Sequence, residues 1–255
     1  MHISLIQCAP EPGGIEATLE KIGNLTGQGT GADLYVLPEM FATGQCLNPE
    51  TVAQCMDGSI VTWMRTMSAN LEAAVAGSVA ICENGKYYNR FCFVKPDGDV
   101  VCYDKRHLFT YSGEGRYFSH GNDRVVTEFR GVRILLQVCY DLRFPVFARN
   151  NDDYDLAIYV ANWPVARQNS WDVFLRSRAM ENQCFVAGVN RVGDDEYGHY
   201  DGHTAFISPY GETLAAAADN EEQIVTGFAD MDRLVHFRTK FPVMQDADLF
   251  ELRKN

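Results

Sequence analysis

Three polar side chains stand where three short apolar runs of the sequence end. Glu39 follows LYVLP, Lys105 follows VVCYD, and Cys139 follows ILLQV. Runs of this length and composition predict buried strands. Because ligands bind beyond the carboxyl ends of parallel strands, we expect the chemistry of this chain to lie at those ends. A carboxylate, an ammonium and a thiol are therefore the first candidates for a catalytic site.

Together the three groups could turn a thiol into a nucleophile. A free thiol has a pKa of ~8.5, so little of it is ionised at neutral pH unless a base or a positive charge assists. Glu39 could take the proton, while the ammonium of Lys105 could stabilise the thiolate and the oxyanion of a tetrahedral intermediate. One such donor contributes about 3 kcal/mol, and the backbone N–H of Tyr140 could be a second. This set predicts acyl transfer from nitrogen to Cys139 and then to water.

Each group taken alone also has a simpler interpretation. Glu39 and Lys105 could be the first solvated residues after buried strands, and free cysteines are often buried only for packing. A Cys-His hydrolase with His107 as its base is a rival, although no papain-type or caspase-type signature surrounds Cys139. The catalytic interpretation therefore depends on all three groups meeting in one small cavity.

Other kinds of chemistry have little support in the sequence. The chain has no Walker A loop, no GxGxxG opening a helix, no GxSxG elbow and no HExxH pair. Its eight cysteines form no CxxC pair and no Cys/His cluster with the spacing of metal ligands. We therefore predict an enzyme without a metal or cofactor, whose cysteines are mostly reduced thiols.

The charge balance limits the partners of the chain. With 22 basic and 34 acidic residues the net charge is −12, which disfavours binding to nucleic acid or to anionic membranes. A small anionic substrate is still possible, because a few local arginines can oppose the overall field. The sequence has no apolar run long enough for a membrane span and no basic, apolar leader, so a cytoplasmic location is expected.

The elements that position these residues alternate along the whole chain, which predicts a single α/β domain over residues 1–255. The predicted strands are Ile3–Cys8, Leu34–Leu37, Ala73–Ala80, Arg90–Lys95, Val100–Tyr103, Val132–Val138, Leu156–Val160, Phe185–Asn190, Ala205–Ser208 and Ile224–Ala229. The predicted helices are Ile15–Thr26, Ser59–Leu71, Phe144–Asn150 and Ser170–Asn182. Strand–helix–strand order favours parallel pairs, while turns at Pro96-Asp97-Gly98 and Pro209-Tyr210-Gly211 favour hairpins. The sheets should therefore be mixed.

At LPEMF, DKRHLF and VCYDLRFP the sequence resembles the nitrilase, or carbon–nitrogen hydrolase, superfamily. The motifs occur in family order, and the resemblance extends over most of the chain. It implies an α-β-β-α sandwich with two mixed central sheets. It also implies that Glu39 is the general base, Lys105 the oxyanion stabiliser and Cys139 the nucleophile that forms a thioester. The family uses a second glutamate beyond the lysine, and Glu114 is the candidate for it.

Within the superfamily, the segments NWP and RSRAMENQ and the tail FPVMQDAD resemble the omega-amidase group, which hydrolyses the terminal amide of 2-oxoglutaramate or 2-oxosuccinamate. Such an enzyme must bind a carboxylate, for which Arg143 and Arg167 are candidates, although either could instead form a surface ion pair. Trp163 could form a wall of the pocket. Gln45 stands where an aromatic residue is more usual in the group, so the exact substrate stays open.

Several alternatives stay open at this stage. N-carbamoyl amidases, aliphatic amidases and nitrilases share nearly the same triad, so the triad does not separate them. A noncatalytic binding subunit is disfavoured by the intact catalytic set. The resemblance also implies a homodimer built on the helix Ser170–Asn182, in which Trp171, Phe174, Leu175 and Ala179 form one apolar stripe. A stripe of this size could equally be buried within one chain.

Overall fold

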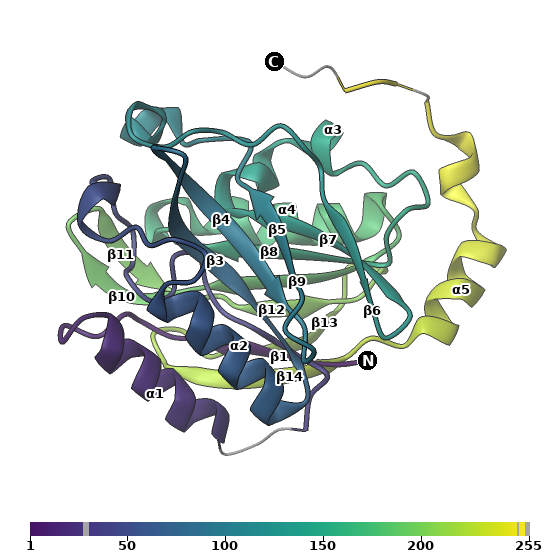
Figure 1. The fold of residues 1–255 in the computed structure, drawn as a ribbon. Helices are drawn as coiled ribbons and strands as arrows, with labels where there is room; N and C mark the ends of the chain where they lie inside the picture. Colours follow the sequence, from purple (N-terminus) through teal and green to yellow (C-terminus); the bar gives the residue numbers. More distant parts are fainter. Residues whose placement is uncertain (28–30, 249, 253–255) are drawn as a thin grey trace.

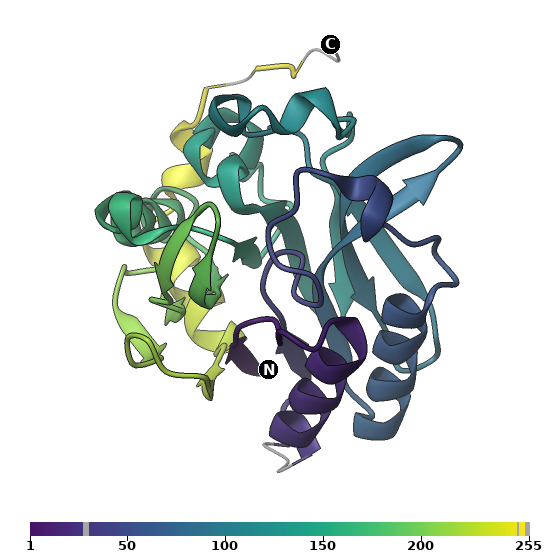
Figure 2. The ribbon, with the colours of Figure 1, turned by 90° about the vertical axis from the view of Figure 1, so that its left-hand side faces the viewer.

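The computed structural model describes residues 1–27, 31–248 and 250–252. Two six-stranded mixed sheets lie at its centre (Figure 1). The first has the order β14-β1-β2-β3-β4-β5, and the second has the order β13-β12-β9-β8-β7-β6. Helices cover the outer faces of both sheets (Figure 2). The predicted α-β-β-α sandwich with mixed sheets is confirmed.

The bounds of the elements are as follows. The first sheet contains β1 His2–Gln7, β2 Leu34–Val36, β3 Ala74–Glu83, β4 Lys86–Val94, β5 Val100–Asp104 and β14 Gln223–Phe228. The second contains β6 Val126–Phe129, β7 Val132–Val138, β8 Leu156–Ala161, β9 Phe185–Asn190, β12 Ala205–Ile207 and β13 Thr213–Ala216. A separate hairpin pairs β10 Val192–Asp195 with β11 Gly198–Asp201.

The α-helices are α1 Ile15–Gly27, α2 Ser59–Leu71, α3 Pro145–Ala148, α4 Gln168–Glu181 and α5 Met231–Lys240. The 3-10 helices are η1 Pro49–Thr51, η2 Thr110–Ser112, η3 Glu114–Arg116, η4 Cys139–Arg143, η5 Val165–Arg167 and η6 Val243–Asp246. None of the helices in the described part of the chain combines the length and apolar content that a bilayer crossing requires.

Side-chain alternation along the strands builds three apolar layers. In β4, Phe91 and Phe93 point into the core between the two sheets, where they meet residues of β7 such as Ile134 and Leu136. Cys92 and Val94, which alternate with them, face the layer beneath α1 and α2 instead. A third layer lies between the second sheet and α4. The apolar side chains of α1, α2 and α4 thus pack on the outer faces of the two sheets.

The apolar stripe of α4 is buried within the chain. Trp171, Leu175 and Ala179 are almost completely buried in the layer between α4 and the second sheet, and Phe174 packs against the same layer. The stripe is therefore already covered by the chain's own second sheet. Any dimer contact through α4 must use its outer face, which exposes Val173.

Each predicted strand is present, with ends that shift by a few residues. β3 and β4 are longer than predicted because Asn84-Gly85, with positive φ at both residues, closes a tight hairpin between them. The predicted helix Phe144–Asn150 is wrong in length, since α3 ends at Ala148. Asn150 instead bonds through its backbone and side chain to Asn182 and through its side chain to Tyr154.

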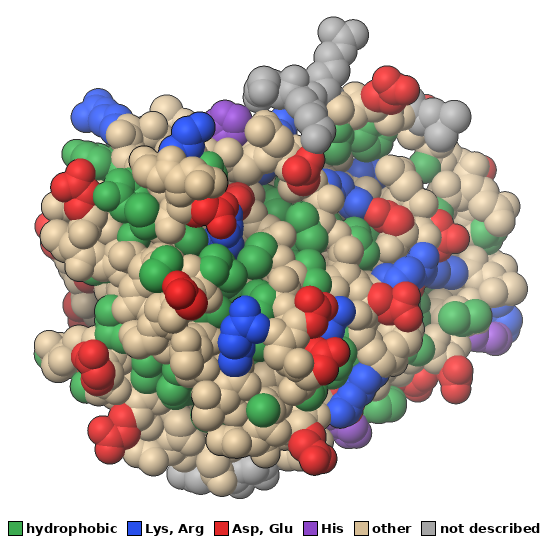
Figure 3. Space-filling view, viewed as in Figure 1, with side chains coloured by type: hydrophobic (Ala, Val, Ile, Leu, Met, Phe, Trp, Pro, Cys, Tyr) green, Lys and Arg blue, Asp and Glu red, His purple; other side chains and the backbone are tan. Residues whose placement is uncertain are grey.

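Among the strands and α-helices of the described residues, β6, β10, β11, β13 and α5 have no counterpart in the sequence prediction. Most of their side chains are exposed or half-buried, and α5 buries only Leu234. The four strands are short and have no buried apolar face, so their sequences lack the alternation that signals a strand, whereas α5 was missed although its apolar residues follow a helical spacing. On the face in Figure 3, acidic side chains are scattered among basic ones instead of gathering in one patch.

Candidate active site

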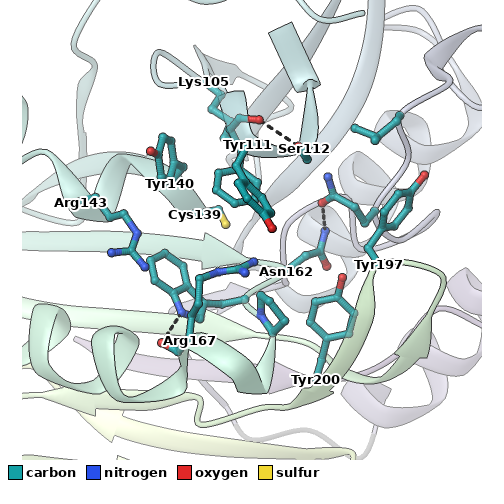
Figure 4. Close-up of a pocket in the computed structure, with 15 residues that line it drawn as sticks. Lys105, Tyr111, Ser112, Cys139, Tyr140, Arg143, Asn162, Arg167, Tyr197 and Tyr200 are labelled. Atoms are coloured by element: carbon teal, nitrogen blue, oxygen red, sulfur yellow. Dashed lines mark hydrogen bonds between the residues drawn. The ribbon is translucent and has the colours of Figure 1, made fainter. Parts of the chain in front are cut away.

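The three predicted residues reach one place because of strand direction. β2 and β3 are parallel, and β3, β4 and β5 alternate in direction, so β2 and β5 run the same way. Glu39 and Lys105 follow the ends of β2 and β5 and therefore lie at the same edge of the first sheet. Cys139 follows the end of β7 in the second sheet. Lys105 and Cys139 line the same pocket (Figure 4).

Lys105 lies between two buried carboxylates. Its Nζ is 2.9 Å from Oε1 of Glu39 and 3.0 Å from both carboxylate oxygens of Glu114. All three side chains are almost completely buried. Burial alone would lower the pKa of Lys105, but the charges of Glu114 and Glu39 outweigh it and raise the pKa well above its ordinary value. Lys105 is therefore an ammonium ion, and Glu114 lies where the resemblance implied it.

Cys139 has a strained backbone and lies in a turn that the carboxylate of Asp141 holds in place. Its φ is +45°, in the left-handed region that residues other than glycine rarely adopt. The buried carboxylate of Asp141 accepts hydrogen bonds from the backbone N–H of Val138 (2.9 Å), the hydroxyl of Tyr103 (2.8 Å) and the backbone N–H of His107 (3.0 Å). Asp141 thus ties the turn that carries Cys139 to the segment that follows Lys105.

The Cys139 thiol is neutral in the resting site. Burial, the negative charge of Glu39 and a hydrogen bond with Glu39 raise the pKa of Cys139 well above its ordinary value, against the opposing charge of Lys105. A proton therefore stays on sulfur next to a carboxylate that can remove it. The arrangement favours a thiol activated by a base during attack, not a thiolate formed in advance.

Cys139 opens onto a cavity of about 370 Å³, which gives its sulfur a route from solvent. Aromatic side chains form much of the wall, and Lys105 lies in the same lining. The lining consists of Gln45, Leu47, Lys105, Phe109, Tyr111, Ser112, Cys139, Tyr140, Arg143, Asn162, Trp163, Pro164, Arg167, Tyr197 and Tyr200. All four residues predicted from the sequence to bind substrate are in this set. Gln45 is also in it, so this departure from the omega-amidase group faces the cavity.

The two arginines differ in their surroundings. The guanidinium of Arg143 lies 4.9 Å from the centre of the Trp163 ring and donates to Ser170 Oγ at 3.2 Å. Arg167 lies over Phe109 at 5.1 Å and extends into the pocket (Figure 4). Within residues 1–27, 31–248 and 250–252, neither arginine forms an ion pair with a carboxylate. Both can therefore bind an anionic substrate group.

Two asparagines that the sequence did not single out hold Glu39. The side-chain amide of Asn89 donates to Oε1 of Glu39 at 2.7 Å, and the backbone N–H of Asn162 donates to Oε2 at 2.8 Å. Asn89 could have been found as a polar residue inside the apolar strand β4. Asn162 acts through its backbone, so its side-chain type carried no signal for this contact.

His107 does not line the cavity. Its Nδ1 is 2.7 Å from Oδ1 of Asp141, and its ring stacks on Phe144 with a centroid distance of 3.9 Å. These contacts place His107 in the support of the turn and not beside the sulfur, which removes the basis for a Cys-His hydrolase. Among the described residues, no cluster of three or more His, Cys, Asp or Glu side chains could hold a metal ion.

Known proteins resemble the chain over most of its length. The carbon–nitrogen hydrolase family model matches residues 2–239. Omega-amidase YafV of Escherichia coli is 47% identical over 224 residues, covering 88% of this chain and 87% of that protein. The 2-oxoglutaramate amidase of Bacillus subtilis is 34% identical over 220 residues, covering 84% and 85%. A CN-hydrolase superfamily protein of Xanthomonas campestris, solved with an arsenic adduct in its active site, is 41% identical, with a TM-score of 0.94 over 99% of both chains.

Proposed function

The chain belongs to the carbon–nitrogen hydrolase family, and we propose that it is an omega-amidase with Cys139 as its nucleophile. It hydrolyses carbon–nitrogen bonds other than peptide bonds. Its substrate is a small 2-oxo dicarboxylic acid monoamide, 2-oxoglutaramate or 2-oxosuccinamate, which it converts to the 2-oxo acid and ammonia. The similarity to omega-amidase YafV and to 2-oxoglutaramate amidase supports this substrate class.

One observation carries the assignment of the residues. Glu39, Lys105 and Glu114 form a buried charged cluster that contacts Cys139, and the sulfur opens onto a cavity that two arginines line. Burying three charges is costly unless each is paired and hydrogen-bonded, so a cluster of this kind is typical of a functional site. A packing role for Cys139 would not explain it.

In the first half of the reaction, Glu39 takes the thiol proton while the sulfur of Cys139 attacks the amide carbon. Lys105 Nζ has three N–H donors and contacts three carboxylate oxygens, two of which belong to Glu114. When the two Glu114 oxygens share one N–H, another N–H is free to stabilise the oxyanion together with the backbone N–H of Tyr140. Protonated Glu39 then gives its proton to the amide nitrogen. The carbon–nitrogen bond breaks, ammonia leaves, and a thioester remains on Cys139.

In the second half, water attacks the thioester. Glu39 again acts as the base, and the same donors stabilise the second oxyanion. The carbon–sulfur bond breaks, the 2-oxo acid leaves, and the proton held by Glu39 returns to Cys139. Glu114 keeps Lys105 charged and in place throughout, since its carboxylate bonds to Nζ through both oxygens.

Ammonia release from a panel of substrates tests this function. The panel contains 2-oxoglutaramate, 2-oxosuccinamate, glutamine, butyramide, an N-carbamoyl amino acid and an aliphatic nitrile. We expect the two 2-oxo acid amides to give the highest kcat/KM and Cys139→Ala to release no ammonia from any of them. Higher activity on the nitrile or the carbamoyl compound would move the chain to another activity of the family. Turnover by Cys139→Ala would remove Cys139 from the mechanism.

Three expectations from the sequence remain proposals. We propose that the chain is a single domain, forms a homodimer and works in the cytoplasm. The family resemblance supports the first two, and the composition supports the third. The exposed outer face of α4 is the surface that we assign to the dimer.

A further inference from the structure

Two cysteines outside the active site lie directly opposite each other in the first sheet. Cys92 of β4 and Cys102 of β5 are partners in the antiparallel register. The backbone N–H of Lys105 donates to the carbonyl of its partner Asn89 at 2.9 Å, so that pair is a hydrogen-bonded one. Hydrogen-bonded and non-hydrogen-bonded pairs alternate along an antiparallel ladder. Three positions from Asn89, the pair of Cys92 and Cys102 is therefore a non-hydrogen-bonded one.

This position suits a disulfide. The Cα atoms of a non-hydrogen-bonded pair lie about 4.5 Å apart, and their side chains are closer than at the alternating pairs. Disulfides span Cα distances of about 4.4 to 6.8 Å, so the backbone need not move far. Both side chains face the layer beneath α1 and α2, and both are free thiols in this structure. In the strand pairs of the described residues, no other register position joins two cysteines.

The two thiols differ in access to solvent. Cys92 is completely buried, whereas Cys102 is partly exposed. A hydrogen bond from the Cys92 thiol favours the thiolate of Cys102, whose pKa is lowered, while the same bond raises the pKa of Cys92. Arg90, two residues before Cys92, adds a positive charge that favours both thiolates. An oxidant thus meets first the thiol that is better able to react with it.

We propose that Cys92 and Cys102 form a redox-active dithiol that a peroxide closes into a reversible disulfide. The Cys102 thiolate attacks the peroxide, which is reduced to an alcohol or water, and Cys102 becomes a sulfenic acid. The sulfur of Cys92 then attacks the sulfur of Cys102. The sulfur–oxygen bond breaks, water leaves with the proton from Cys92, and the disulfide forms. A dithiol reductant reverses the step by thiol–disulfide exchange.

This modification uses other thiols than the proposed hydrolysis, whose nucleophile Cys139 follows β7 of the second sheet. It still bears on the active site, since β4 and β5 also carry Asn89 and precede Lys105. Asn89 precedes Cys92 by three residues, and Lys105 follows Cys102 by three residues. The side chains of Asn89 and Lys105 therefore lie on the opposite face of β4 and β5 from the two cysteines. In a reducing compartment a bond of this kind is transient, as for redox-sensing cysteines.

Peptide mapping after mild oxidation tests the proposal. Wild type and Cys139→Ala are treated with hydrogen peroxide, alkylated under denaturing conditions and digested without reductant. In both proteins we expect peptides joined through Cys92 and Cys102, with a mass two hydrogen atoms lower than the sum of the reduced peptides. The joined species should disappear when dithiothreitol is added. Because Cys139→Ala is included, failure of the proposed hydrolysis would not affect the result.

Single variants give the controls. Cys92→Ser should lose the joined peptide and accumulate a sulfenic acid at Cys102 that dimedone labels, whereas Cys184→Ser, which changes another buried cysteine, should keep the joined peptide. The proposal is overturned if both thiols of the oxidised wild type remain open to alkylation. It is also overturned if Cys102 proceeds to sulfinic acid in the wild type as fast as in Cys92→Ser. Thermal unfolding of each variant shows that it is folded.

Discussion

At the residue scale, Glu39 has two opposite effects on Cys139. Its charge and its hydrogen bond raise the pKa of the thiol, which lowers the share of thiolate at rest. We propose that the same carboxylate is the base that removes the proton during attack. Reactivity toward substrate and reactivity toward a simple alkylating agent should therefore respond differently to its removal.

We expect Glu39→Gln to lower kcat by roughly 10² to 10⁴-fold, the usual contribution of a general base. Alkylation of Cys139 by iodoacetamide should become faster at about pH 8, because loss of the negative charge lowers the raised pKa of the thiol and increases the thiolate share. Glu114→Gln is the control, with a smaller gain in alkylation because its charge affects the thiol least. Slower alkylation of Glu39→Gln would contradict the proposed charge balance.

The arginines give a second prediction at this scale. We expect Arg167→Leu to raise KM for 2-oxoglutaramate by about 10- to 100-fold, the contribution of a charge-assisted hydrogen bond. Hydrolysis of butyramide, which lacks the carboxylate, should be unchanged. Arg143→Leu is the matched variant. It should affect both substrates alike, because Arg143 packs on Trp163 at the pocket wall. Equal loss for the two amides in Arg167→Leu would assign Arg167 a structural role.

Much of the proposed site could be predicted at this scale, because the chemical type of each reactive side chain indicates what it can do. Glu39, Lys105 and Cys139 are a base, a cation and a nucleophile at the ends of apolar runs. Asn162 could not be found in this way, since it bonds to Glu39 through its backbone. Tyr200 was missed for another reason: it lines the cavity from β11, a strand whose mixed polar sequence gives no periodic signal.

At the element scale, α5 is attached by the buried Leu234, by the contact of Phe237 with Tyr210 and by the hydrogen bonds of Arg238. Arg238 donates to Asp155 Oδ1 at 2.8 Å, to the carbonyl of Tyr154 at 2.8 Å and to the carbonyl of Gln183 at 3.0 Å. Leu234 is the helix's only buried residue. Met231, Leu234 and Val235 follow a helical spacing, but the segment is short and only Leu234 is buried, and a helix was not predicted there.

We expect Arg238→Met to lower the free energy of unfolding by about 2 to 3 kcal/mol at pH 7, because Asp155 loses a partner and two carbonyls lose a donor. Burial would raise the pKa of Asp155, but its hydrogen bonds from Arg133 and the charges of Arg133 and Arg238 lower it below 3.8. The contribution of this carboxylate is therefore present above pH 3.8 and lost as the pH falls through its lowered pKa.

Urea unfolding at neutral and acid pH measures this effect. The loss in the free energy of unfolding of Arg238→Met should be smaller at acid pH but not zero, since the hydrogen bonds to the two carbonyls do not depend on pH. Arg233→Met on the same helix is the control. Arg233 is exposed and lies 3.7 Å from Glu212, so its loss should cost less than about 1 kcal/mol. A deficit for Arg238→Met as small as that of the control would contradict the attachment role.

At the scale of the whole molecule, we propose the outer face of α4 as the surface that binds a second copy. Val173 and Met180 lie seven residues apart on that face and are about half exposed. We expect light scattering to give twice the mass of one chain, and Val173→Glu with Met180→Glu to give a single chain with unchanged circular dichroism. A monomeric wild type would contradict the homodimer.

The layered architecture was predictable because its strands are apolar runs of a recognisable length, and because family motifs placed them. The order of strands within each sheet was not predictable, since it depends on strand partners that lie far apart in the sequence. β1 shows the difference. Its sequence predicts a buried strand, but nothing in it indicates that β14 pairs along its whole length.

The pairing of β1 with β14 also has a consequence for how the protein is made. On the ribosome β1 emerges well before its partner β14, because the strands β2 to β13 lie between them in the sequence, so one edge of β1 stays open while those strands are synthesised. An open apolar edge is a template for wrong pairing with other chains. The edge of β1 is therefore covered only once β14 has been made, and a chain that stops before β14 leaves that edge without its partner.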